Sequence, residues 1–236
     1  MKLKMNTVLR QEKKYLIGLE DSHKLSNYLE KMLIKDKHNG IDGYIVRSLY
    51  FDTIHEKDFS EKEDGVELRR KIRLRIYDPK DKFAFLEIKQ KQGNNQLKRT
   101  LKVTKEDAQE LIKGNYSVLL KYEEKFAQEC YVIMNTQMYR PKSVVQYNRK
   151  AFIAKENSIR ITFDSNIIAT ETCFDIFSEN LNMYPVFSKY NTVLEVKYNG
   201  FLLSYIKDML ETAQKSELSV SKYCLARKAT LNYIFI

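Results

Sequence analysis

The amino-acid sequence predicts an α+β fold, built as a closed antiparallel β-barrel of about eight strands with helices packed outside. First, apolar and charged residues alternate with a period of two in many segments, which is typical of strands that bury one face. Second, short amphipathic helices separate these segments, and each helix needs an apolar surface to cover. Third, about eight strands make a barrel whose interior just holds side chains or one small ligand.

The charged residues of each expected strand fall on one face. The strands are expected at 8–16, 44–52, 68–77, 83–91, 96–103, 143–152, 158–168 and 192–199. In 68–77, Lys71, Arg73 and Arg75 alternate with apolar residues, and in 192–199 Glu195 and Lys197 do the same. The other such faces are Arg10, Glu12 and Lys14; Glu87, Lys89 and Lys91; Tyr147 and Arg149; and Arg160, Thr162 and Asp164.

Five helices are expected between the strands, at 22–35, 104–113, 122–137, 201–212 and 221–232. The first has one apolar stripe, formed by Leu25, Tyr28, Leu29, Met32 and Leu33. We expect Ser22 or Asp21 to cap its N-terminus. The second begins with Thr104 and Asp107, which resemble a capping box, and Gly114 ends it.

Length and composition favour one folded domain with an anionic partner. At 236 residues the chain can bury a substantial core, so a single domain over residues 1–236 is expected. Hydrophobic residues make up 43%, which excludes a disordered chain, and only 3 Pro and 7 Gly argue against long flexible linkers. The 41 Lys and Arg exceed the 31 Asp and Glu, so nucleic acid, nucleotide, polyphosphate and a membrane surface stay open as partners.

The cysteines and the apolar runs indicate a cytoplasmic protein without a membrane segment. Cys130, Cys173 and Cys224 are sparse and odd in number, which is typical of reduced thiols inside cells. No apolar run approaches the roughly 18 residues that a membrane span needs, and no signal peptide is visible at the Lys-rich start. The three histidines are isolated, which argues against a histidine-based metal or catalytic site.

Two interpretations of the charged strand faces are open at this point. Each face could simply be solvated, as in an ordinary half-buried strand. Alternatively, the helices cover the apolar faces, and the charged faces point at one another inside the barrel. The repeated pairing of cations with Glu or Asp favours the second interpretation. Because buried like charges are costly unless they are compensated, such a lumen predicts a bound polyanion and a metal ion.

Eight short motifs occur in a consistent order along the chain. They are Arg10-x-Glu12-x-Lys14-Tyr15, Ser48-Leu49-Tyr50-Phe51-Asp52-Thr53, Lys71-x-Arg73-x-Arg75, Leu86-Glu87-Ile88-Lys89, Tyr147-x-Arg149, Arg160-x-Thr162-x-Asp164, Leu194-Glu195-x-Lys197 and Ser221-Lys222-Tyr223. Their order resembles the triphosphate tunnel metalloenzymes, or CYTH-like superfamily. It is more similar still to the VTC domain, the catalytic domain of the vacuolar transporter chaperone polyphosphate polymerase. The resemblance covers about residues 8–232.

The resemblance implies a phosphotransferase that adds the γ-phosphate of ATP to a polyphosphate chain inside a cationic tunnel. In that family, tunnel cations bind the phosphate chain and glutamates hold Mn²⁺ or Mg²⁺. The matching catalytic and phosphate-binding cations are Lys14, Arg73, Arg75, Lys89, Arg149, Arg160 and Lys222, with Lys197 as a further phosphate-binding residue. The matching metal ligands are Glu195 and, second, Glu12. These types suit the chemistry, because Arg grips phosphate oxygens bidentately and carboxylates are hard ligands for both metals.

Lys222 has separate physical support. Ser221 is a suitable N-cap, which places Lys222 in the first turn of the last expected helix. The N-terminus of a helix presents free N–H groups and a positive dipole end to anions.

The first strand departs from the hydrolases and cyclases of the superfamily. They carry Glu-x-Glu-x-Lys, whereas here Arg10 precedes a single Glu12, which favours the VTC branch. Three other functions stay open: a metal-dependent tripolyphosphatase or nucleoside triphosphatase, a polyphosphate-binding module without turnover and, ranked last, an RNA-binding protein. No RNA-recognition signature is present, so no nucleic-acid partner is expected.

ATP and inorganic polyphosphate or triphosphate are therefore the expected small partners. Polymerases of the VTC branch often carry an N-terminal inositol-phosphate-sensing domain and a membrane anchor. This chain starts almost at its first expected strand, so regulation or translocation is expected from a separate membrane-protein partner.

Overall fold

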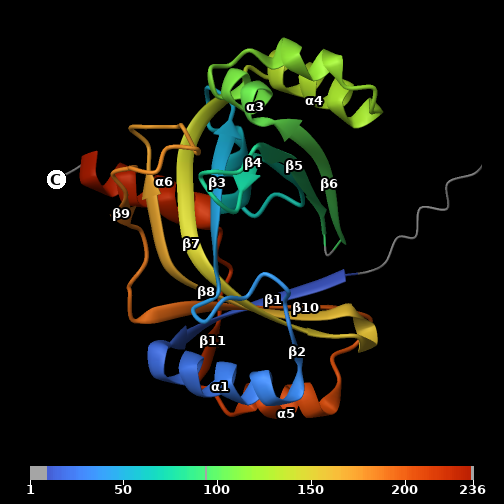
Figure 1. The fold of residues 1–236 in the computed structure, drawn as a ribbon, viewed down its shortest axis with the longest axis vertical. Coiled ribbons are helices and arrows are strands. Elements are labelled where there is room, and N and C mark those ends of the chain that lie inside the picture. The colour runs from blue at the N-terminus through green and yellow to red at the C-terminus, as the bar shows by residue number, and fades with distance from the viewer. Residues whose placement is uncertain (1–9, 94, 235–236) are drawn as a thin grey trace, which may run out of the picture.

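The protein is built on one antiparallel sheet with helices around it (Figure 1). The computed structural model describes residues 10–93 and 95–234, so residues 8 and 9 of the first expected strand lie outside the described residues. The long strands are β1 (Arg10–Gly18), β3 (Tyr44–Asp52), β4 (Leu68–Ile76), β5 (Phe83–Gln92), β6 (Asn95–Thr104), β7 (Arg140–Ala154), β8 (Ile159–Thr170) and β10 (Asn191–Asn199). The short ones are β2 (Ile34–Lys35), β9 (Tyr184–Pro185) and β11 (Lys215–Glu217). All eight expected strands are therefore present.

The sheet is open, which corrects the expectation of a closed barrel. Its strands follow the order β11-β1-β10-β8-β7-β3-β4-β5-β6, and no ladder joins the two ends of this path in the described part of the chain. The physical reason lies at β1, whose free edge is partly taken by β11, with Tyr15 opposite Glu217. The sheet curls instead, and irregular pairing at Tyr50/Phe51 and at Gln146/Asn148 provides local bends.

The five expected helices are present, together with one that the sequence did not indicate. The helices are α1 (Leu19–Met32), α2 (Lys57–Glu63), α3 (Lys105–Ile112), α4 (Lys125–Thr136), α5 (Ser204–Glu211) and α6 (Lys222–Ile234), with the 3₁₀ turns η1 (Tyr116–Lys121) and η2 (Glu156–Ser158). The missed helix, α2, has seven residues and no apolar stripe. Its first turn is stabilised instead by Asp52 at the end of β3, whose carboxylate accepts the backbone N–H groups of Asp58 and Phe59. No helix among the described residues is long and apolar enough to cross a membrane.

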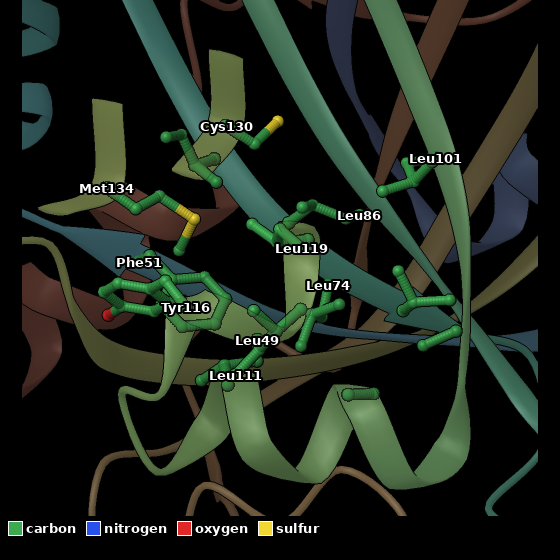
Figure 2. Close-up of a cluster of buried hydrophobic side chains, with 14 of the residues drawn as sticks. Leu49, Phe51, Leu74, Leu86, Leu101, Leu111, Tyr116, Leu119, Cys130 and Met134 are labelled. Atoms are coloured by element: carbon green, nitrogen blue, oxygen red, sulfur yellow. The ribbon is translucent and has the colours of Figure 1, made fainter. Parts of the chain in front are cut away.

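Helices α1, α3, α4 and α5 cover the outer, apolar faces of the sheet, whereas α6 packs against Tyr50 and Tyr147 on the cavity side. In Figure 1, α3 and α4 lie over the part formed by β3–β6, while α1 and α5 lie against β1 and β10. Figure 2 shows the first of these cores, in which Leu49, Leu74 and Leu86 of the strands meet Leu111 and Leu119 of α3 and η1. Because the apolar faces are covered from outside, the charged faces point into the curl of the sheet.

Two helix ends test the caps that the sequence predicted. Helix α1 begins at Leu19 with Gly18 in the capping position, so neither Ser22 nor Asp21 caps it. Strand β1 runs directly into this helix, which leaves no turn where a side-chain cap could sit. Its buried face is Ser22, Leu25, Ser26 and Leu29, whereas Tyr28 and Met32 of the expected stripe are exposed. At α3, the expected cap is confirmed, because Thr104 Oγ1 accepts the backbone N–H of Asp107 at 3.1 Å.

We expect the stability of the fold to fall between about pH 4 and pH 8 through one buried carboxyl group. Burial and the neighbouring Asp52 raise the pKa of Asp58 to about 8, and the hydroxyl of Tyr139 donates to its Oδ1 at 2.9 Å. The unfolded chain releases this proton near pH 4, so the folded state loses stability as pH rises toward 8. Asp58→Asn should therefore raise the melting temperature more at pH 8.5 than at pH 5.

The matched control is the exposed Asp42, whose replacement by Asn should change the melting temperature equally at both pH values. Thermal unfolding followed by circular dichroism measures both variants. An equal effect of Asp58→Asn at the two pH values would show that the group does not titrate in this range.

Candidate functional site

A cavity of about 670 Å³ lies inside the curl of the sheet. All ten site residues expected from the sequence lie on its wall: Glu12, Lys14, Arg73, Arg75, Lys89, Arg149, Arg160, Glu195, Lys197 and Lys222. They come from β1, β4, β5, β7, β8, β10 and the start of α6. The volume is in the range of small-ligand sites. The structure thus brings the residues together, while their roles stay predictions.

Strand pairing fixes how these side chains face one another. In the β1–β10 ladder Lys14 is opposite Glu195, and Glu12 is opposite Lys197. The next ladder places Lys197 opposite Arg160. Because directly paired residues point to the same side of a sheet, each carboxylate faces a lysine across the β1–β10 pair, and Lys197 lies between Glu12 and Arg160.

Asp164 holds two of the cavity cations in place. It is fully buried, and its carboxylate accepts two 2.7 Å hydrogen bonds from the guanidinium of Arg149. The ammonium group of Lys222 lies 2.6 Å from its Oδ2. Burial alone would raise the pKa of Asp164, but Arg149 and Lys222 outweigh it and keep the pKa below its usual value. Both cations are therefore fixed in position.

Glu87 plays the same part for Arg73 and Arg75 of β4. Its Oε2 accepts from Arg73 Nε at 2.8 Å, and Lys98 Nζ lies 2.5 Å from Oε1. The pKa of Glu87 would be raised by burial, but Arg73, Arg75 and Lys98 lower it. Arg75 is held more loosely, since its Nη1 lies 3.7 Å from Glu87 and its buried Nε has no partner among the described residues. Arg75 therefore has donors to offer a ligand.

Glu195 and Glu12 lie side by side with two lysines between them. Lys14 is 2.8 Å from Glu12, and Lys197 forms ion pairs with both carboxylates. Burial would raise the pKa of Glu195, yet Lys197, Lys14 and Arg149 hold it well below its usual value. Both carboxylates are thus ionised, as ligands of a hard cation must be.

The two carboxylates fit a divalent metal as part of its coordination only. Among residues 10–93 and 95–234, no group of three or more His, Cys, Asp or Glu side chains is arranged to hold a metal ion. Mg²⁺ is commonly bound through one or two carboxylates plus substrate phosphates. Glu195 and Glu12 suit this arrangement, in which phosphate oxygens complete the site.

Lys89 differs from the other expected site cations because it forms no ion pair within the described residues. Burial lowers its pKa well below 10.5, and repulsion from Arg73 and Lys197 lowers it further. The nearby Glu195 and Glu12 offset this only partly. A polyanion in the cavity would raise the pKa of this amine and so favour its charged form.

We therefore expect binding of a phosphate chain to take up a proton in the pH range just above the lowered pKa of Lys89. Between the lowered pKa of free Lys89 and its raised pKa in the complex, the amine is neutral before binding and charged afterwards, so affinity falls as pH rises through this window. Calorimetry with tripolyphosphate in buffers of different ionisation enthalpy measures the uptake. Lys89→Met should lose it and the exposed Lys113→Met should keep it. Equal uptake in Lys89→Met and the parent protein would contradict the assignment.

The end of the cavity near α6 is built as the sequence indicated. Ser221 Oγ accepts the backbone N–H of Cys224 at 3.4 Å, so Ser221 caps α6 and Lys222 occupies its first turn. Lys71, from the same strand face as Arg73, donates to the same hydroxyl. The free N–H groups of this helix therefore lie at a cationic wall.

Several lining residues were not among the expected site residues. The additional cations are Lys62, Arg69, Arg70, Lys71, Lys91 and Lys98, and the additional aromatic residues are Tyr44, Tyr50, Tyr77 and Tyr147. Strand alternation alone could have indicated Lys71 and Lys91, which share faces with expected residues. Tyr44 gave no such signal, although its hydroxyl accepts from Arg160 at 3.1 Å. Arg160 is held in turn by Asp36, whose Oδ2 lies 2.7 Å from Arg160 Nη1.

An antiparallel sheet that curls around a cavity lined by Arg, Lys and Glu side chains, with helices on its outer face, places the protein among the triphosphate tunnel proteins. More narrowly, the chain belongs to the VTC domain family, whose model matches residues 9–231. This confirms the resemblance seen in the motifs. No curated protein matches the chain.

Several solved structures have a similar fold. A Bacillus halodurans protein described as a candidate adenylate cyclase is 11% identical, with a TM-score of 0.49 over 86% of this chain and 88% of the other. A Pyrococcus horikoshii protein is 12% identical, with a TM-score of 0.45 over 92% and 99%. A chain of the Schizosaccharomyces pombe Mediator head module is 8% identical, with a TM-score of 0.49 over 89% and 99%. Similarities this low carry no argument about activity.

Proposed function

We propose that this protein is a polyphosphate polymerase-like phosphotransferase, which transfers the γ-phosphate of ATP to a polyphosphate chain inside the cavity with Mn²⁺ or Mg²⁺. The observation that carries the proposal is the convergence of eight expected cations and two expected carboxylates around one cavity. Membership of the VTC domain family supports the same reaction class. The proposal includes a single catalytic domain over the whole chain.

The side chains divide into those that would contact the phosphate chain and those that hold the contacting side chains in position. Arg75, Lys89 and Arg160 offer charge to phosphate oxygens, while Glu87 and Asp164 hold other cations at fixed points. Transfer of a phosphoryl group requires alignment of the attacking and leaving oxygens and neutralisation of charge, with little covalent help from the protein. Cations held in fixed positions around the cavity would supply both the alignment and the charge neutralisation.

Glu195 and Glu12 would hold the metal. A metal ion held there would supply positive charge that offsets the negative charge of the phosphate oxygens during transfer. The carboxylates contribute by standing on adjacent strands and by remaining ionised among the lysines.

Incubation with ATP and Mn²⁺, followed by gel analysis of phosphate chains and an assay of free phosphate, tests the proposal. We expect long chains and ADP. Free phosphate without chains would replace the proposal by a hydrolase, and neither product would leave a polyphosphate-binding module. The control variant Lys113→Ala should behave as the parent protein. Lys113 lies at the C-terminal end of α3, outside the cavity, and forms an ion pair with Glu110 of that helix.

A cytoplasmic location and a membrane-protein partner also belong to the proposal. The thiols of Cys130, Cys173 and Cys224 are free, which suits a reducing compartment. ATP, as the proposed phosphate donor, is available there.

A further inference from the structure

Along the cavity faces of β4 and β5, charged residues are followed by aromatic residues at one end of the cavity. On β4 the cavity face reads Arg69, Lys71, Arg73 and Arg75, and the next residue in this alternation is Tyr77. On β5 the face of Lys91, Lys89 and Glu87 continues into Phe85 and Phe83. The cations suit phosphate, whereas flat rings suit a flat apolar partner. The cavity therefore has two chemically different ends.

Aromatic side chains from three segments meet at this end. The ring of Tyr77 lies 6.0 Å from that of Tyr44 and 6.2 Å from that of Phe85. The ring of His38 is parallel to that of Tyr77, at 6.1 Å and with 1° between their planes. Tyr77 and Tyr44 line the cavity, and Tyr77 is 37% exposed. The rings are thus grouped but not fully covered by protein.

The loop that carries His38 is fastened to the phosphate-binding wall. Asp36 Oδ1 accepts the backbone N–H of His38 at 3.0 Å, and Asp36 Oδ2 lies 2.7 Å from Arg160. Arg160 also donates to the hydroxyl of Tyr44 at 3.1 Å. A ligand that touches both the rings and Arg160 would therefore meet a preorganised surface.

We propose that the cluster of His38, Tyr44 and Tyr77 binds the base of a nucleoside triphosphate whose phosphates lie along the cationic wall. The inference rests on the proposed function and adds to it the site that selects a nucleotide over a bare phosphate chain. A nucleoside triphosphate has the same polarity as the cavity, with a flat ring system at one end and three phosphates at the other. Stacking on aromatic side chains tolerates any base, so the site prefers nucleotides without choosing one base strictly.

The test compares two ligands, ATP and inorganic tripolyphosphate, by calorimetry on the full chain. Tyr77→Ala should weaken ATP binding by about tenfold, the scale of one stacked base, and leave tripolyphosphate binding unchanged. Tyr77→Phe keeps the ring and should bind both ligands as the parent protein does. His38→Ala, at an exposed position, should weaken only ATP binding. Tyr28→Ala is the control, because Tyr28 is similarly exposed on α1, away from the cavity.

The outcomes separate the base site from the proposed function. If Tyr77→Ala and His38→Ala leave ATP binding unchanged, or weaken both ligands equally, the base site is wrong while the phosphate-binding cavity stands. If a single-stranded oligonucleotide without a terminal triphosphate binds as tightly as ATP and loses the same affinity in Tyr77→Ala, the rings serve nucleic acid and the proposal is overturned. If the parent protein binds neither ATP nor tripolyphosphate, the proposed function fails together with the base site.

Discussion

Arg75→Ala should weaken binding of tripolyphosphate by about 2 kcal/mol, roughly 30-fold, with little loss of folding stability. Arg75 is buried, lines the cavity and has an Nε without a partner among the described residues. Its one ion pair, to Glu87, is long at 3.7 Å. Removing it leaves Glu87 with Arg73 and Lys98, so no buried charge loses its last partner. Calorimetry measures the affinity, and thermal unfolding measures the stability.

A second arginine provides the contrast. Arg149 gives two 2.7 Å hydrogen bonds to the fully buried Asp164, so Arg149→Ala leaves this carboxylate with Lys222 alone. We expect Arg149→Ala to lose stability as well as affinity. Lys113→Ala, at an exposed position outside the cavity, controls for the loss of one positive charge. Unchanged tripolyphosphate binding in Arg75→Ala would remove this arginine from the phosphate site.

The strand faces could be predicted from the sequence because their chemistry repeats every second residue. Once the helices are known to be amphipathic, the apolar faces must be covered from outside, and the charged faces are left to share one cavity. Lys14, Arg73 and Glu195 are 181 residues apart at their extremes, from 14 to 195, yet this argument and the motifs placed them together. The period-two alternation of the strands and the need to cover their apolar faces with helices were sufficient to predict this part of the site.

The supporting residues could not be predicted in the same way. Asp164 appears in a motif, but nothing in its spacing shows that it holds both Arg149 and Lys222. Asp36 lies in a short loop, and its partner Arg160 is far along the chain. Such contacts depend on how separate strands meet, which local patterns do not encode. The open edge of the sheet has the same origin, because it depends on where β11 pairs with β1.

Glu195→Gln should reduce metal-dependent turnover by roughly 100-fold or more while the fold survives. Glu195 is buried, lines the cavity and is kept ionised by Lys197, Lys14 and Arg149. The substitution keeps the shape of the side chain and removes its charge. Because one negative charge then disappears from a cationic wall, tripolyphosphate binding without metal should persist or become tighter.

The alternative role of Glu195 is a structural ion pair with Lys197. That role predicts a lower melting temperature for Glu195→Gln and an unchanged dependence on Mn²⁺. Electron paramagnetic resonance of Mn²⁺ added to the protein with tripolyphosphate gives a readout that does not need turnover, and a ligand role predicts weaker Mn²⁺ binding in the variant. Glu217→Gln is the matched control, since Glu217 also lines the cavity but is exposed on β11. Loss of a metal ligand weakens metal binding, so its effect on turnover is largest at low Mn²⁺. Normal turnover of Glu195→Gln at low Mn²⁺ would therefore show that this carboxylate is no ligand.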